Sequence, residues 1–180
     1  MKKLRFLILL CCAWHSLDLT AANSHHIGLG LSAYFFQQDL HEQFSNTVGY
    51  TASYGYTLPF ASRFEPEVGI RLEYYVPKKD GFDNENILIT PQVSALLYNE
   101  LFPLGGRIGY DINYWKQTKT YIQKEVFHED ILYGLALGIF SKTRLPGAWG
   151  HIEYSLTYHL QQFALSTTFF ALGVQYVLDL

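Results

Sequence analysis

Hydrophobic and polar residues alternate with a period of two along most of the chain after its first two dozen residues. Successive side chains of a β-strand point to opposite faces, so this alternation predicts strands rather than helices. In each stretch one face carries bulky apolar residues without charge, and the opposite face is rich in Gly, Ser and Thr. Eight such segments cover about residues 27–35, 47–58, 65–76, 87–98, 107–115, 131–140, 151–160 and 169–180.

The number and length of these segments predict the fold class. Ten residues at about 3.3 Å each, tilted by about 45°, cover roughly 23 Å, which is close to the apolar band of an outer-membrane barrel. Closure of eight strands pairs every backbone N–H and C=O group, which lipid cannot do. We therefore expect an all-β protein, an eight-stranded antiparallel up-and-down transmembrane β-barrel, over residues 25–180.

Side-chain size indicates which face points outward. The interior of an eight-stranded barrel is only just wide enough to be filled by side chains, so bulky Ile, Leu and Tyr from every strand would overfill it. Aromatic residues make up 17% of the chain, and Tyr suits a lipid–water boundary, where its ring is buried and its hydroxyl is hydrated. We predict that the apolar face contacts lipid and the small polar face fills the lumen. The alternative is a soluble ligand-binding barrel with the two faces exchanged.

The first 24 residues have the pattern of a signal peptide. Three basic residues among the first five precede the apolar run 6–14, and small residues follow near position 22. The run is too short to span a bilayer, and its order is that of a secretory signal. We expect residues 1–24 to be removed. Cys11 and Cys12 leave with them, so the mature chain would hold no disulfide.

The connecting segments alternate in length and predict an orientation. Segments 37–46, 77–86 and 117–130 are long and polar, whereas 59–63, 99–103 and 142–147 are short and carry Pro or Gly. Bacterial barrels have short periplasmic turns and longer external loops, which places both termini on the periplasmic side. Pro91 falls inside the fourth segment, where a closed barrel has no free edge, so we expect a bulge there or a bilayer-embedded part that starts after it.

With these features the chain resembles the small outer-membrane barrels of the OmpA/OmpX type, over about residues 27–180. The resemblance lies in the signal peptide, the eight strands and a C-terminal strand of alternating hydrophobic residues, Val174, Tyr176, Leu178 and Leu180. It implies location in the outer membrane of a Gram-negative cell and assembly by the barrel-assembly machinery. Members of the family usually end in Phe, and Leu180 departs from that pattern.

Charged residues on the polar face are the first candidates for a site. Unpaired charges would be costly in a narrow lumen, so the two arginines should pair with the carboxylates. We expect a plug that fills the barrel; a gated, narrow ion-conducting pore is the alternative. The predicted lumen charge network consists of Glu65, Glu67, Arg71, Glu73, Arg107, Asp111 and Glu153.

A second candidate site lies on the seventh segment, where His151, Ser155 and His159 share a face. Some small outer-membrane barrels are lipid A deacylases or acyltransferases that use His, Ser and an acid, so a lipid A-modifying enzyme is a further alternative. A nucleophile needs a base within hydrogen-bond reach, and residues two apart on a strand are roughly 6.6 Å apart. We expect no catalysis.

The remaining expectations concern partners. A net charge of −3 at pH 7 disfavours nucleic-acid binding. The sequence contains no cofactor motif and no zinc-ligand spacing, and the adjacent His25 and His26 have no third ligand nearby. We expect no metal and no cofactor, a monomer, and contacts with outer-membrane lipid and lipopolysaccharide. An extracellular partner could bind the long loops, and the role would be structural or surface-interactive.

Overall fold

A computed structural model describes residues 24–37, 44–58, 64–79, 82–97, 103–121, 124–144, 149–162 and 167–180. The predicted signal peptide, apart from Ser24, lies outside the described residues. The strands of the described chain are β1 (Ser24–Phe36), β2 (Thr47–Thr57), β3 (Phe64–Tyr75), β4 (Lys78–Lys79), β5 (Phe82–Leu97), β6 (Leu104–Tyr121), β7 (Lys124–Arg144), β8 (Gly150–Gln162) and β9 (Thr167–Asp179).

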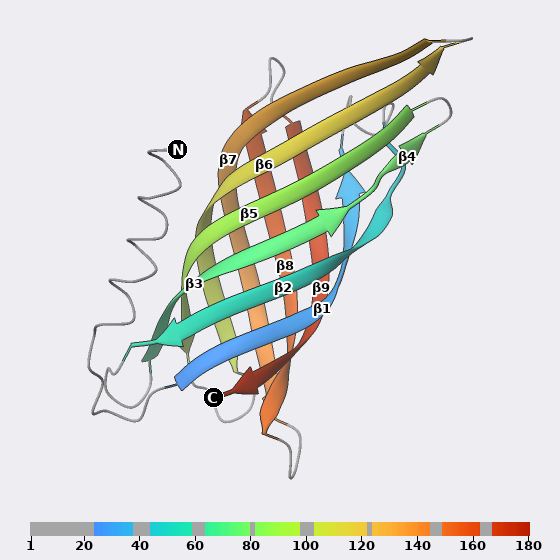
Figure 1. Ribbon diagram of the computed structural model, residues 1–180. Helices are drawn as coiled ribbons and strands as arrows, with labels where there is room; N and C mark the ends of the chain where they lie inside the picture. The colour runs from blue at the N-terminus through green and yellow to red at the C-terminus, as the bar shows by residue number, and fades with distance from the viewer. Residues whose placement is uncertain are drawn as a thin grey trace, which may run out of the picture.

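These strands form a closed antiparallel barrel (Figure 1). The order runs β3-β2-β1-β9-β8-β7-β6-β5-β4, and pairing of β3 with β5 closes the ring. The two-residue β4 continues β3 after a break at Val76 and Pro77, because both pair with β5 in the same register. The wall therefore consists of eight strands, and the predicted fold class is confirmed.

The two faces of the wall are also as predicted. Apolar side chains point away from the barrel axis, with Leu29 67% and Tyr50 69% exposed. Side chains of the opposite face are buried in the lumen, and Asp111 is 0% exposed. A soluble barrel with the faces exchanged is therefore excluded by the side-chain orientation.

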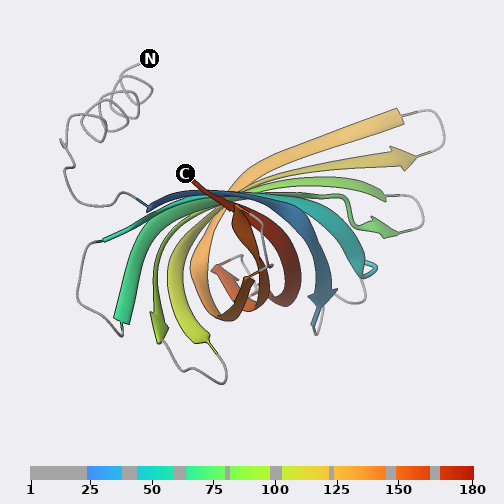
Figure 2. The same cartoon turned by 90° about the horizontal axis from the view of Figure 1, so that it is seen from below.

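Three strands are longer than predicted, mainly at one end of the barrel. β5 has 16 residues, β6 has 18 and β7 has 21, against about ten expected. Segments 77–86 and 117–130, predicted as loops, are largely antiparallel hairpins, and β6 pairs with β7 as far as Tyr121 and Lys124. The prediction was wrong there because it required an apolar face. The two strands of a hairpin pair their backbone N–H and C=O groups with each other, and this pairing does not need an apolar face. Figure 2 shows these extensions reaching to one side of the ring.

Pro91 lies within β5 without a bulge. β5 pairs with β6 through Ile89 and Ile112 on one side of the proline, and through Gln92 and Gly109 on the other, in one unchanged register. Pairing lapses only at Thr90 and Pro91, as expected for a residue without an N–H group. The predicted bulge was wrong, and the strand tolerates the loss of one ladder hydrogen bond.

The two ends of the barrel differ. One end, here the short-turn end, carries the connections β2–β3, β5–β6 and β7–β8 and both ends of the described chain. There the N–H of Leu180 donates to the carbonyl of His25 at 2.8 Å. The opposite end, here the hairpin end, carries the extended β4, β5, β6 and β7. Both ends of the described chain, Ser24 and Leu180, thus lie at the end of the short turns, which agrees with the predicted placement of both termini at that end.

Candidate functional site in the lumen and on the outer wall

The inward faces of all eight wall strands converge on a lumen that is polar in its middle. Alternation sends every second side chain of each strand to this space, so residues distant in sequence meet there. Ion pairs and hydrogen bonds link them in three groups, here together called the lumen network: Arg71 with Glu73, Arg107 with Glu153, and Asp111 with His159.

Arg71 and Glu73 are neighbours on the inward face of β3. The Nε of Arg71 donates to Oε1 of Glu73 at 3.1 Å, and both side chains are almost fully buried. The remaining guanidinium nitrogens reach Ser155 on β8 at 3.4 Å and Ser32 on β1 at 3.3 Å. Thr51 on β2 donates to the same carboxylate oxygen at 3.2 Å. One ion pair thereby connects four strands across the lumen.

Arg107 and Glu153 form the second pair, between β6 and β8. The Nη2 of Arg107 donates to Oε1 of Glu153 at 2.6 Å, and Nε2 of Gln175 donates to that oxygen at 2.9 Å. The guanidinium also lies 4.5 Å from the ring centroid of Phe140, within cation–π range. These contacts compensate part of the desolvation cost that two buried charges carry.

Asp111 and His159 form the third group. Oδ2 of Asp111 lies 2.7 Å from Nδ1 of His159, and Oδ1 accepts a hydrogen bond from Thr90 at 2.7 Å. The imidazole stacks on Phe169 with ring centroids 4.6 Å apart. Its Nε2 lies 3.9 Å from Oε2 of Glu73, so the third group adjoins the first.

The structure places the other two predicted lumen charges near the short-turn end. Glu67 pairs with Lys142 at 3.1 Å, whereas Glu65 is exposed and lies outside the lumen network. Lys142 was missed, because the sixth segment was ended at position 140 and this lysine was assigned to a connection. Its even position, two after the inward Phe140, was the signal that could have found it.

The hairpin end of the lumen is aromatic, which the sequence did not predict. Tyr34 stacks on Tyr75 with centroids 4.1 Å apart, and Phe169 lies 6.2 Å from Tyr34. The expectation of small polar residues inside was therefore wrong at this end, although the inward positions of these rings were in register with the polar face. The buried cluster comprises Tyr34, Phe36, Phe44, Tyr75, Leu88, Trp115, Leu132, Phe169 and Ala171.

The three residues of the enzyme alternative each have a different partner. His151 Nδ1 lies 3.3 Å from Asp179, and Ser155 accepts a hydrogen bond from Arg71. His159 is held by Asp111. No hydrogen bond joins the serine to either histidine in the described structure. The three residues share a face, but they do not form a nucleophile–base pair.

His26 lies beside His151 at the short-turn end. Its Nδ1 is 2.9 Å from Asp179 and its Nε2 is 2.7 Å from Thr57, whereas His25 points outward and contacts Tyr54 at 2.7 Å. Within the described residues no group of three or more His, Cys, Asp or Glu side chains is arranged to hold a metal ion.

The four residues predicted for assembly on the C-terminal strand all face outward. β9 pairs with β8 on one side and with β1 on the other, so the last strand of the barrel is joined to the first. The four residues predicted for assembly, Val174, Tyr176, Leu178 and Leu180, are exposed on the outer wall.

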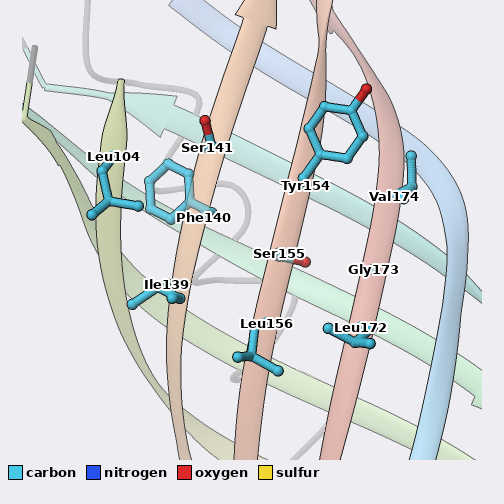
Figure 3. Close-up of a pocket in the computed structure, with 10 residues that line it drawn as sticks. All are labelled: Leu104, Ile139, Phe140, Ser141, Tyr154, Ser155, Leu156, Leu172, Gly173 and Val174. Atoms are coloured by element: carbon cyan, nitrogen blue, oxygen red, sulfur yellow. The ribbon is translucent and has the colours of Figure 1, made fainter. Parts of the chain in front are cut away.

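The outer wall is hollowed between two rows of these outward side chains. A shallow groove of about 350 Å³, here the wall groove, crosses β6, β7, β8 and β9 (Figure 3). Ser141 and Tyr154, which are paired across β7 and β8, contribute hydroxyl groups to one row. The other outward side chains of the groove are Leu104, Ile139, Leu156, Leu172 and Val174.

Solved structures, and not relatives in sequence, identify the fold of the chain. No protein-family model matches the chain, and no curated protein matches it in sequence. Within the part of the chain that the structure describes, there is no helix long and apolar enough to cross a membrane.

Solved structures of small outer-membrane barrels are similar to the chain. Ail, the attachment invasion locus protein of Yersinia pestis, matches at 12% identity and a TM-score of 0.53, covering 87% of this chain and 99% of that chain. The N-terminal β-barrel domain of OprF from Pseudomonas aeruginosa matches at 11% identity and 0.51, covering 84% and 96%. The outer membrane enzyme PagL matches at 8% and 0.50, covering 86% and 99%. The fold is therefore that of the small outer-membrane barrels.

Proposed function

We propose that the chain is an integral outer-membrane barrel whose lumen is plugged by side chains and whose role is structural or surface-interactive, without catalysis. The observation that carries this proposal is the contrast between the two faces of the barrel wall. Apolar side chains cover its outside, and charged and polar side chains are paired inside. In water such a surface would be strongly unfavourable, whereas in a bilayer both faces are satisfied.

The contacts within the lumen support a plug. Arg71 and Arg107 each pair with a carboxylate, and Lys142 pairs with Glu67 nearer the short-turn end. The buried aromatic cluster fills the hairpin end. An ion crossing this lumen would have to displace ion pairs and rings from sites that offer little water to replace them.

The extended hairpins support a surface-interactive role. β4, β5, β6 and β7 project beyond the barrel at the end opposite both ends of the described chain (Figure 1). Short periplasmic turns and longer external segments are typical of bacterial barrels, so the hairpin end would face the outside of the cell. There it would present paired strands to an extracellular partner or to lipopolysaccharide. The resemblance of fold to Ail, an attachment invasion locus protein, is consistent with such a role.

The arrangement of the histidines favours a barrel without enzymatic activity. PagL shows that this fold can carry an enzyme. In the present chain Ser155 accepts a hydrogen bond from an arginine, His159 is hydrogen-bonded to Asp111, and His151 lies 3.3 Å from Asp179. A serine nucleophile requires an adjacent base, which this network does not supply.

Conductance measurements test the plug. The purified barrel in planar lipid bilayers should be electrically silent, because paired charges and rings occupy the lumen. Removal of one arginine, as in Arg71→Ala, leaves space and an unpaired Glu73 and should produce cation-selective steps if the lumen network is what blocks the path. Glu65→Ala, at an exposed position, should stay silent and serves as control. Discrete steps in the unaltered protein would contradict the plug and favour the narrow pore.

A further inference from the structure

At the hairpin end one edge of β7 has no neighbouring strand. β7 pairs with β6 from Lys124 onward, whereas its pairing with β8 begins only at Tyr133 and Gln162. Residues 124–132, here the open edge, therefore face no strand on the β8 side within the described chain. Figure 2 shows β7 on the outside of the projecting strands. At about 3.3 Å per residue the open edge is roughly 30 Å long.

Alternate residues of the open edge direct their backbone N–H and C=O groups away from β6. In an antiparallel ladder every second residue of a strand bonds to the same neighbour. The N–H of Ile131 donates to Oδ1 of Asp130 at 2.8 Å, which places this amide on the side away from β6. By the same alternation the residues that share this side are Glu125, Phe127 and Glu129. Such a row of backbone groups is a template for pairing with another strand.

The other edge of the projecting strands is built differently. There the strand order ends at β4, which consists only of Lys78 and Lys79 and follows Pro77. A short edge strand, lysine and proline are features that prevent pairing with another chain. The open edge has none of this shortness and contains no proline. One edge is thus protected, and the other can accept a strand.

The open edge is acidic. It contains one basic and three acidic residues, which give a net charge of −2: Lys124, Glu125, Glu129 and Asp130. Glu129 and Asp130 are exposed, and as strand neighbours they point to opposite faces. Lys116 of β6 stands opposite Glu129, but Glu85 of β5 flanks it on the other side and shares its charge. Like charges on paired strands are unfavourable, so a basic segment fits this edge better than a second copy of it.

We propose that the open edge of β7 pairs with a basic, extended segment of an extracellular protein, which adds a strand to the projecting sheet. The inference rests on the proposed external position of the hairpin end, and it names the surface and the chemistry of the partner. Main-chain hydrogen bonds supply the affinity of such strand addition. The carboxylates of the open edge favour lysine and arginine in the partner.

Peptide binding to the full barrel in phosphatidylcholine nanodiscs tests the open edge. The probes are nine-residue fluorescent peptides in which threonine alternates with lysine or with glutamate. A third probe is the lysine peptide with methyl groups on alternate backbone nitrogens, which removes N–H donors. Fluorescence anisotropy should show binding of the lysine peptide and about tenfold weaker binding of the other two. Equal binding of the glutamate peptide would contradict the preference for a basic partner.

Two variants at one position isolate the backbone contribution. Glu129→Pro removes an N–H group of the open edge without removing a hydrogen bond to β6, and should weaken binding of the lysine peptide about tenfold. Glu129→Gln is the matched control, because it removes the charge and keeps the N–H group. It should weaken binding only about twofold. Equal affinities of the two variants, or undiminished binding of the methylated peptide, would overturn strand pairing at this edge.

Labelling of intact cells separates this inference from the proposed function. A membrane-impermeant maleimide should react with Glu129→Cys, because the hairpin end would face the outside of the cell. Absence of labelling would overturn the external position. Labelling without binding of the lysine peptide would overturn only the open edge as a binding surface. Dimers of the unaltered barrel in place of peptide binding would identify a second copy as the occupant and contradict the basic partner.

Discussion

Replacing Arg107 with Leu is expected to lower the free energy of unfolding by about 3–5 kcal/mol, one of the two largest effects that we predict for a single substitution. The substitution leaves the buried Glu153 without the guanidinium that lies 2.6 Å from its carboxylate. It also removes the cation that contacts Phe140. Denaturant unfolding of the barrel in detergent micelles, followed by tryptophan fluorescence, measures the change.

Two further variants isolate the cause. The double variant Arg107→Leu, Glu153→Leu removes both charges and should recover much of the loss, because the cost comes from the unpaired carboxylate. Glu65→Gln changes an exposed carboxylate outside the lumen network and should alter stability by about 0.5 kcal/mol at most. A double variant as unstable as Arg107→Leu would show that packing, and not charge, dominates at this position.

Replacing Gly30 with Val is expected to prevent closure of the barrel. A Cβ atom at Gly30 would overlap the backbone carbonyl of Val174 and approach the Cα of Gln175 at 2.5 Å. These atoms belong to β9, which pairs with β1 at the seam of the ring. Neither backbone can move without breaking the ladder, so most of the protein should fail to reach the form that migrates differently before and after boiling on a detergent gel.

Gly106→Val is the matched control for this prediction. Gly106 lies on the outward face of β6, and a Cβ atom there meets no heavy atom within 4 Å. Valine favours strands, so this variant should assemble as well as the unaltered chain. Normal assembly of Gly30→Val would mean that the seam between β1 and β9 is wider than the structure has it.

Much of the fold was predictable because one physical rule governs it. The alternation of Leu29, Leu31 and Ala33 with Gly28, Gly30 and Ser32 fixes the face of each residue. A shift of one residue would put every side chain on the wrong face, so the pattern also constrains register. Eight repeats of this rule suffice for a closed barrel.

The extent of the strands was not predictable from the same rule. Beyond the apolar belt both faces of β6 and β7 are mainly polar, and the alternation that identifies a strand disappears. The hairpin forms there because Tyr121 and Lys124 continue a ladder that has already begun, which is a tertiary cause. Strands extended by pairing alone carry no signal in hydrophobic periodicity.

Which side chains pair within the lumen could not be predicted from the sequence, and the reason is a different one. That arginines should pair with carboxylates follows from the cost of buried charge, but which carboxylate each one meets depends on barrel register. Arg107 contacts Glu153, 46 positions away, and Asp111 contacts His159, 48 positions away. The aromatic cluster was missed because inward rings such as Tyr34 and Tyr75 come from strands that are not adjacent, so their stacking appears only after closure.

The central claim, that the apolar face of the wall contacts lipid, is tested most directly along the outward edge of β7. Residues 25–180 contain no cysteine, so single cysteines at Glu129, Tyr133, Leu137 and Thr143 can each carry a spin label. In vesicles we predict high collision rates with oxygen and low rates with a water-soluble nickel complex at Tyr133 and Leu137. The reverse is predicted at Glu129 and Thr143. High accessibility to the nickel complex at Leu137 would contradict the account.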